Sequence, residues 1–253
     1  MTTTKKINSK TNSRKIAWDF GMTSVLILFL FRIPISNILG SDGNGYFAIA
    51  WETGALFSVL FGCYVGKAIT SMVKRRNSKQ QFHNSTLVLN TALVYSSLIS
   101  VLGAVVLYFF ADFITGNLFG VKLSRLALQL SAVWLVIYVI TNVFRGYFEG
   151  MGTKVPTYFS KIIEVLTGGT VACIVTTILG NYGKKVGALL FDEQYKASFS
   201  ATGLMLGAIS GIIIALLFLL VVNFIYQIPL KEMYKKDETK VPEQTKYLLV
   251  EIW

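Results

Sequence analysis

The sequence predicts an all-α fold: a polytopic membrane protein built on a bundle of six transmembrane helices, with both termini in the cytoplasm. The chain is 53% hydrophobic and only 15% charged, whereas soluble domains average about 25% charged residues. The charged residues cluster between apolar runs of roughly 20 residues, which is the length a helix needs to cross a bilayer. The short alternating segments of a transmembrane β-barrel are not seen in the sequence.

Six apolar runs define the expected spans: residues 16–39, 46–73, 84–112, 122–147, 155–182 and 200–226. A basic cytoplasmic tail, residues 1–15, precedes them, and a charged cytoplasmic linker, residues 227–246, follows them. The final residues, 247–253, turn apolar again but are too few to span a bilayer. We expect them to begin a seventh helix that is missing, so the chain resembles one half of a larger protein.

Basic residues set the expected orientation. If the spans alternate in direction, 17 Lys and Arg residues fall on one side of the membrane and 5 on the other. The positive-inside rule then places the richer side, with both termini, in the cytoplasm. The net charge of +11 therefore reflects topology, and we expect no nucleic-acid partner.

Proline and glycine residues predict how the spans end. Pro34 is expected to kink or stop the first span, and residues 40–45 to form a flexible outer turn. Residues 116–122 and 181–198 are expected to be the other two outer loops. Glycines spaced four apart, which let helices approach closely, predict helix contacts at three places: Gly62/Gly66, Gly146/Gly150 and Gly203/Gly207/Gly211.

Three ionisable residues within the spans are candidates for binding substrate, because charge in a bilayer usually faces a water-filled cavity or a partner. Arg32 either lines such a cavity or snorkels to the headgroups. For Glu52 we favour exposure to an aqueous cavity over pairing with another helix. Lys67 either binds an anionic headgroup or snorkels inward. Glu52 and Lys67 are 15 residues apart, so in one helix they would share a face at a separation of roughly 22 Å.

Residues 144–164 form a polar connection between the fourth and fifth spans, with Arg145, Glu149 and Pro156 as hinge or gating candidates. The spacing of Arg145 and Glu149 favours a local ion pair, with a latch of the inward-closed state as the alternative. No catalytic, metal-binding or phosphate-loop motif is present in the sequence. We therefore expect neither an enzyme nor a cofactor, and transport energy from a coupling ion (proton or sodium) or the membrane potential.

Three stretches together carry a resemblance to a known family. They are Ile33–Gly40 with Gly43-x-Gly45-Tyr46, Ala68-Ile69, and Arg145–Met151 with Val155-Pro156-Thr157. Their order resembles the N-terminal lobe of the MOP (MATE-like) superfamily of exporters. Within it, the chain is most similar to the polysaccharide-biosynthesis, stage V sporulation protein B and MurJ-like lipid II flippase group.

The resemblance implies two six-helix lobes around a V-shaped cavity in a bacterial plasma (inner) membrane. By alternating access they would move an undecaprenyl-diphosphate-linked oligosaccharide to the outer leaflet for cell-envelope synthesis. Arg32 best matches a diphosphate-binding cation of that family. Ser71 stands where relatives often have Lys, and Lys67 lies one turn earlier. The expected partners are the lipid-linked oligosaccharide diphosphate, the bilayer, and a missing C-terminal lobe or a second copy.

Two other interpretations stay open. One is a cation-coupled multidrug antiporter of the MATE type, against which the basic residues of the cavity argue mildly. The other is a non-transporting membrane scaffold or partial lobe, which fits a half-length chain. Loss of export in Arg32→Ala or Glu52→Ala variants, without loss of protein, would favour the flippase.

Overall fold

The computed structural model describes residues 2–62, 64–234 and 237, with side chains described for 22–62, 64–226 and 237. The described chain is helical and holds no strand. Its long helices are, in order, α1 (Thr2–Phe61), α2 (Val65–Asn77), α3 (Phe82–Phe109), α4 (Arg125–Gly150), α5 (Val155–Leu190) and α6 (Gln194–Tyr234). The predicted all-α membrane bundle is therefore confirmed, although residues 247–253, the expected start of a seventh helix, lie outside the described residues.

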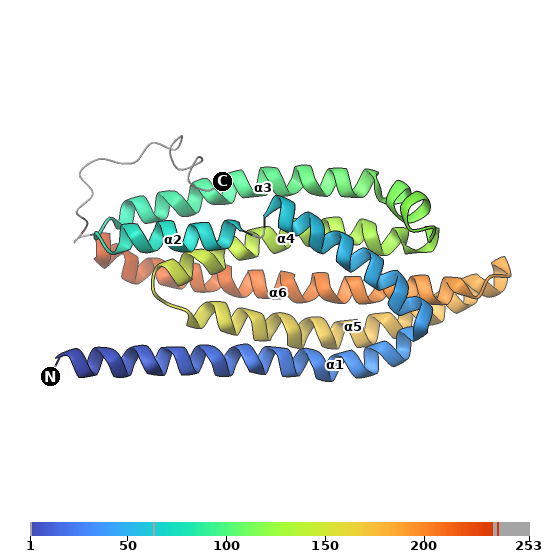
Figure 1. Cartoon of the computed structure of the whole chain (residues 1–253), viewed down its shortest axis with the longest axis horizontal. Coiled ribbons are helices and arrows are strands. Elements are labelled where there is room, and N and C mark those ends of the chain that lie inside the picture. The colour runs from blue at the N-terminus through green and yellow to red at the C-terminus, as the bar shows by residue number, and fades with distance from the viewer. Residues whose placement is uncertain (1, 63, 235–236, 238–253) are drawn as a thin grey trace.

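Five helices in the described part are long and apolar enough to cross a membrane. The first of them, Met22–Asn77, contains both of the first two expected spans. Within α1, Gly40 alone has non-helical backbone angles (φ 68°, ψ −172°), which only glycine adopts readily. Figure 1 shows α1 turning back on itself at this bend, so its two limbs run in opposite directions.

The bend corrects two expectations about this region. Pro34 lies inside the helix and does not end it, and residues 41–45 are helical where a flexible loop was expected. The side-chain amide of Asn44 donates to the carbonyl oxygen of Gly40 at 2.6 Å and to that of Ser36 at 3.1 Å. These bonds satisfy carbonyls that the bend frees, so the chain reverses with a single non-helical residue.

Helix ends elsewhere also differ from the sequence prediction. The loop expected at 181–198 shrinks to Phe191–Glu193, because α5 continues to Leu190 and α6 begins at Gln194. At the other end, α6 runs on to Tyr234, into the segment expected as a linker. Residues 113–118 form a π-helix and 122–124 a 3-10 helix. The chain in 1–15 is helical from Thr2.

Every connection that the charge pattern assigns to the cytoplasm lies at one end of the bundle in Figure 1, together with the N-terminus. These are the α2–α3 turn, the α4–α5 connection and the end of α6. The Gly40 bend and the α5–α6 turn lie at the opposite end. The alternation of the spans is thus as the sequence predicts.

Close packing at the predicted glycines is confirmed. A Cβ atom on Gly146 of α4 would overlap the carbonyl oxygen of Gly66 of α2, and one on Gly150 would lie 2.6 Å from Cβ of Val73. Thr70 adds a hydrogen bond from its hydroxyl to the carbonyl oxygen of Gly146 at 3.2 Å. Because neither helix has room for a side chain there, α2 and α4 pack backbone to backbone.

The same principle joins α5 to α6. A Cβ on Gly207 or Gly211 would overlap backbone or side-chain atoms of Ala172 and Glu164, and one on Gly203 would lie 2.7 Å from Cα of Thr176. This is the most extensive helix pair of the bundle. Large apolar side chains, such as Leu98 and Leu102 of α3, are exposed on the outside of the bundle, as expected for lipid-facing surface.

Candidate functional site

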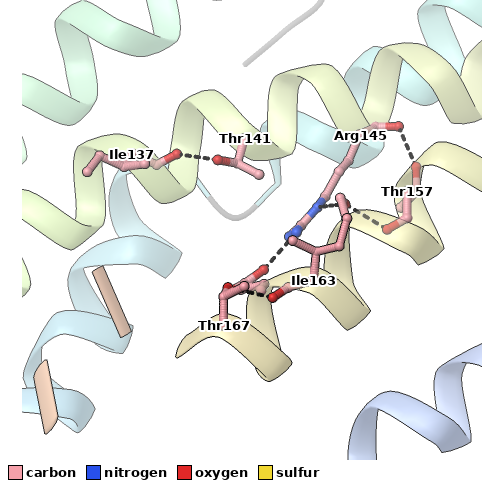
Figure 2. Close-up of polar contacts among 8 residues, drawn as sticks. Ile137, Thr141, Arg145, Thr157, Ile163 and Thr167 are labelled. Carbon is pink, nitrogen blue, oxygen red and sulfur yellow. Dashed lines mark hydrogen bonds and ion pairs between the residues drawn. The ribbon is translucent and has the colours of Figure 1, made fainter. Parts of the chain in front are cut away.

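Arg145 is a buried cation near the end of α4, with its side chain only 8% exposed. Its Nη2 lies 2.7 Å from Oε2 of Glu164 on α5, and its Nε donates to Oγ of Ser160 at 2.9 Å. Figure 2 shows the side chain reaching from α4 across to α5. A guanidinium presents its donors in a rigid fork, so the two contacts fix its position on α5.

The first turns of α5 present polar side chains to α4 at helical spacing. Thr157, Ser160 and Glu164 follow one another at three and four residues, so they lie on one face. The Thr157 hydroxyl donates to the carbonyl oxygen of Arg145 at 3.3 Å, and the Ser160 hydroxyl donates to that of Thr157 at 2.8 Å. We call Arg145, Thr157, Ser160 and Glu164 the α4–α5 clamp.

The clamp closes over a short connection. Residues 151–154 join α4 to α5, with Gly152 at φ 91°, where an L-residue would be strained. Pro156 lies in the first turn of α5, where its missing N–H costs no helical hydrogen bond. The amide of Asn77 reaches the carbonyl oxygen of Met151 at 3.4 Å, so the end of α2 also touches this connection.

The expected local ion pair of Arg145 with Glu149 is wrong. The guanidinium contacts Glu164, 19 residues along the chain, because α5 brings a carboxylate to the buried side of α4. Glu149 is half-buried at the end of α4 and is not part of the clamp. The sequence prediction overlooked Glu164, although a lone carboxylate within an apolar span is a recognisable signal.

Arg32, Glu52 and Lys67 are all exposed on the surface of the bundle. Arg32 lies on the first limb of α1, Glu52 on the second limb, and Lys67 on α2. No hydrogen bond or ion pair within the described part of the chain joins any of them to another side chain. The shared face expected for Glu52 and Lys67 assumed one continuous helix, whereas the helix is broken between Phe61 and Val65.

Four aromatic rings of α1 and α4 lie against one another and were missed from the sequence. Phe47 stacks on Trp51 in α1, and Trp134 stacks on Tyr138 in α4, while Trp51 meets Trp134 at an interplanar angle of 49°. We call these four rings the aromatic ladder. Its successive ring centroids are 5.7, 5.0 and 4.6 Å apart. The spacings of four residues within each helix were visible in the sequence, but the contact between the helices was not. Within the described residues there is no cluster of three or more His, Cys, Asp or Glu side chains suited to a metal ion.

Known proteins resemble this chain over most of its length. A family model described as "Polysaccharide biosynthesis protein" matches residues 16–241. Stage V sporulation protein B of Bacillus subtilis (strain 168) is 24% identical over 201 residues, which cover 79% of this chain and 36% of that protein. The chain therefore spans little more than a third of this relative's length. No solved structure matches.

Proposed function

We propose that this chain, which belongs to the polysaccharide biosynthesis protein family, is a lobe of a flippase. The flippase would carry a lipid-linked oligosaccharide diphosphate across a bacterial plasma membrane, and it would be a transporter, not an enzyme. Alternating access would deliver the substrate to the outer leaflet for cell-envelope synthesis, as lipid II or another polysaccharide unit. A second lobe or a second copy of this chain would complete the cavity.

The observation that carries the proposal is the pair of exposed cations Arg32 and Lys67 on helices of a membrane bundle. A Lys or Arg within a membrane-spanning helix costs free energy, up to about 2.5–3.5 kcal/mol at the centre of the span on insertion scales. Such residues therefore usually face water or a charged ligand. Arg and Lys are also the side chains that bind phosphate groups, so a diphosphate headgroup fits these positions.

The α4–α5 clamp supports alternating access as the mechanism. Arg145 and Glu164 hold the two helices together beside the connection 151–154, and Pro156 fixes the direction in which α5 begins. In one state of the cycle the clamp is closed, as it is here. In the other state the connection bends, and Glu149 at the end of α4 moves with it. A proton or sodium gradient, or the membrane potential, supplies the energy.

The test is a flipping assay with the full-length protein in liposomes. The substrate is a fluorescent undecaprenyl-diphosphate-linked N-acetylglucosamine, and a membrane-impermeant quencher reports the lipid that reaches the outer leaflet. We expect Arg32→Ala and Lys67→Ala each to slow flipping at least tenfold. Lys79→Ala removes an exposed cation in the α2–α3 turn and serves as the matched control with an unchanged rate.

The outcomes separate the competing functions. Flipping at the normal rate by both variants would refute the role of these cations. Absence of flipping by the wild-type protein, with uptake of a cationic drug in the same liposomes, would favour the multidrug antiporter. Absence of both activities in the wild-type protein would favour a non-transporting scaffold.

A further inference from the structure

The connection between α3 and α4 carries large apolar side chains that the described protein leaves uncovered. The helix long enough to cross the membrane ends at Phe109 and the next one begins at Lys122, so residues 110–121 join two spans. Four apolar side chains of this connection are at least half exposed: Phe110, Phe113, Leu118 and Phe119. Exposed apolar patches mark surfaces that contact a protein or a membrane. Figure 1 shows residues 113–118 at the same end of the bundle as the Gly40 bend.

Helical spacing joins this connection to the lipid-facing side of α3. Five exposed apolar residues follow one another at intervals of three or four: Leu98, Leu102, Val105, Phe109 and Phe113. Residues at these intervals lie on one face of a helix. The backbone stays helical past the end of α3, since the N–H of Ile114 donates to the carbonyl oxygen of Phe110 at 2.9 Å. The apolar surface of the span therefore continues beyond the span itself.

The backbone of the connection is hydrogen-bonded within the protein. Residues 113–118 form a π-helix. The N–H of Phe119 donates to the carbonyl oxygen of Ile114 at 3.1 Å, and that of Val121 donates to the carbonyl oxygen of Thr115 at 2.6 Å. A connection in water can leave such groups to the solvent, whereas lipid requires that the protein satisfy them. This pairing suits a segment that lies against lipid.

Charged side chains border the same apolar face. Asp112 lies three residues after Phe109, so the two side chains are neighbours on the helix. Nε of Arg125 lies 3.0 Å from Oδ1 of Asp112, and both side chains are about half exposed. Lys122 is exposed, and a Cβ on Gly116 would lie 3.5 Å from Cγ of Lys122. The aliphatic part of the lysine thus lies along the π-helix, as a lysine does when it places its charge among lipid headgroups.

A phospholipid fits both parts of this surface. Its acyl chains match the apolar row, which is continuous with the lipid-facing side of α3, and its phosphate matches the cations. Lys122 and Arg125 against Asp112 leave one net positive charge, which favours an anionic headgroup. A second copy of this chain would bring the same net positive charge to the contact, and like charges oppose such an interface.

We propose that residues 109–125 form a binding site for an anionic phospholipid at this end of the bundle. The acyl chains lie against Phe109 and Phe113, and the phosphate lies beside Lys122 and Arg125. The charge pattern assigns this end of the bundle to the outer leaflet. The site goes beyond the proposed flippase and does not depend on it, because the phospholipid is held at the surface of the bundle and is not the transported substrate.

The test places a fluorescent reporter in the site. Phe113→Trp adds an indole to the full-length protein, which is reconstituted in vesicles of phosphatidylcholine and phosphatidylglycerol. Either lipid is supplied with brominated acyl chains, which quench an indole that they contact. The signal of the four natural tryptophans is measured in the wild-type protein and subtracted. Glu193→Trp is the matched control, because it adds an exposed indole in the α5–α6 turn, which extends beyond the other helices in Figure 1.

We expect brominated lipid to quench the added indole of Phe113→Trp and to leave that of Glu193→Trp unquenched. Phosphatidylglycerol should associate with the site about fivefold more tightly than phosphatidylcholine, the effect of one net positive charge near an anionic lipid. Adding Lys122→Gln, which leaves the Asp112–Arg125 pair in place, should make the two lipids equal. Adding Lys122→Arg should keep the preference, and so should Lys184→Gln, which removes an exposed cation of α5.

Three results would overturn the assignment. Quenching of Phe113→Trp no stronger than that of Glu193→Trp would mean that the connection does not contact lipid. A preference for phosphatidylglycerol that survives Lys122→Gln would mean that this cation binds no headgroup. Equal loss of the preference in Lys122→Gln and Lys184→Gln would mean that the overall charge of the protein sets it. Thermal unfolding checks that each variant is folded, and each of these failures leaves the proposed function standing, because no flipping is measured.

Discussion

The α4–α5 clamp predicts that loss of its two charges, one at a time, lowers the free energy of unfolding by unequal amounts. We compare Arg145→Met with Glu164→Met, since methionine is unbranched and uncharged, matches glutamate in length, keeps most of the aliphatic part of arginine and forms helices well. Glu164→Met leaves a guanidinium that cannot lose its proton. Arg145→Met leaves a carboxylate, which can be neutralised by a proton. Removal of the acid should therefore destabilise the protein more than removal of the base.

Burial sets the size of the difference. The Arg145 side chain is 8% exposed and that of Glu164 is 25% exposed. Breaking a buried ion pair by removing one partner costs about 3–5 kcal/mol, and we assign this full range to Glu164→Met. For Arg145→Met we expect about 1–3 kcal/mol, because the remaining carboxylate keeps part of its hydration and escapes the full penalty of an unpaired buried charge.

The assay is reversible unfolding in mixed detergent micelles, followed by tryptophan fluorescence. The double variant Arg145→Met/Glu164→Met leaves no unpaired charge, so it should be more stable than Glu164→Met alone. The interaction free energy from the cycle should reach about 2–3 kcal/mol. Lys161→Met changes an exposed charge on the same helix and should stay within about 0.5 kcal/mol of wild type.

Two results would refute this reasoning. A cost for Arg145→Met equal to or above that of Glu164→Met would mean that the packing of the arginine outweighs its charge. Strict additivity in the double variant would mean that the two groups do not interact in the folded protein, in spite of the 2.7 Å between them.

Three further predictions concern single positions. Gly146→Ala should lower the free energy of unfolding by more than 1 kcal/mol, since overpacking typically costs about 1–3 kcal/mol and a Cβ there overlaps backbone of α2; an unfolding curve measures it. Gly40→Ala should lower the free energy of unfolding by about 1–3 kcal/mol, because alanine is strained at these backbone angles. Gly45→Ala should not destabilise the protein, because a Cβ at Gly45 has open space around it. Equal effects of the two substitutions would contradict the role of the bend. Asp237→Ala removes the carboxylate that accepts a hydrogen bond from the His83 backbone amide at 2.7 Å near the start of α3. Hydrogen exchange of that amide should become about fivefold faster, because the lost cap stabilises the helix by roughly 1 kcal/mol. An unchanged exchange rate would exclude the cap.

The architecture followed from the sequence because its signals are local. Apolar length alone locates the spans, and Lys74–Arg76 closes one of them at the predicted end. Glycines four apart at Gly146 and Gly150 predict close packing, because a helix surface without side chains allows any neighbouring helix to approach closely. The sequence spacing did not reveal that the single residue Gly40 would form the whole turn. A turn this short requires donors for the backbone carbonyls at the bend, and here the Asn44 side chain donates to the carbonyl of Gly40.

The candidate site was harder to predict because its partners are set by contacts between helices. Helical spacing favoured Glu149 as the partner of Arg145, but a short connection returned α5 alongside α4 and presented Glu164. Likewise, Trp51 and Trp134 are 83 residues apart in the sequence, and no periodicity joins them. Pairing across helices depends on rotation and depth, which a single sequence does not specify.

The glycine contacts between α5 and α6 have a mechanical consequence. Helices that meet backbone to backbone do not slide easily past each other, so the pair should move as one body. α4 meets α5 at the connection 151–154 and the clamp, and it packs on α6 through Trp134. α5 has 36 residues, so it is about 54 Å long, and its far end, together with the start of α6, extends beyond the other helices in Figure 1. A rotation of about 10° at the connection would carry that far end roughly 9 Å, given about 1.5 Å of rise per residue. A small rotation at the short connection would therefore produce a large displacement at the far end of the α5–α6 pair.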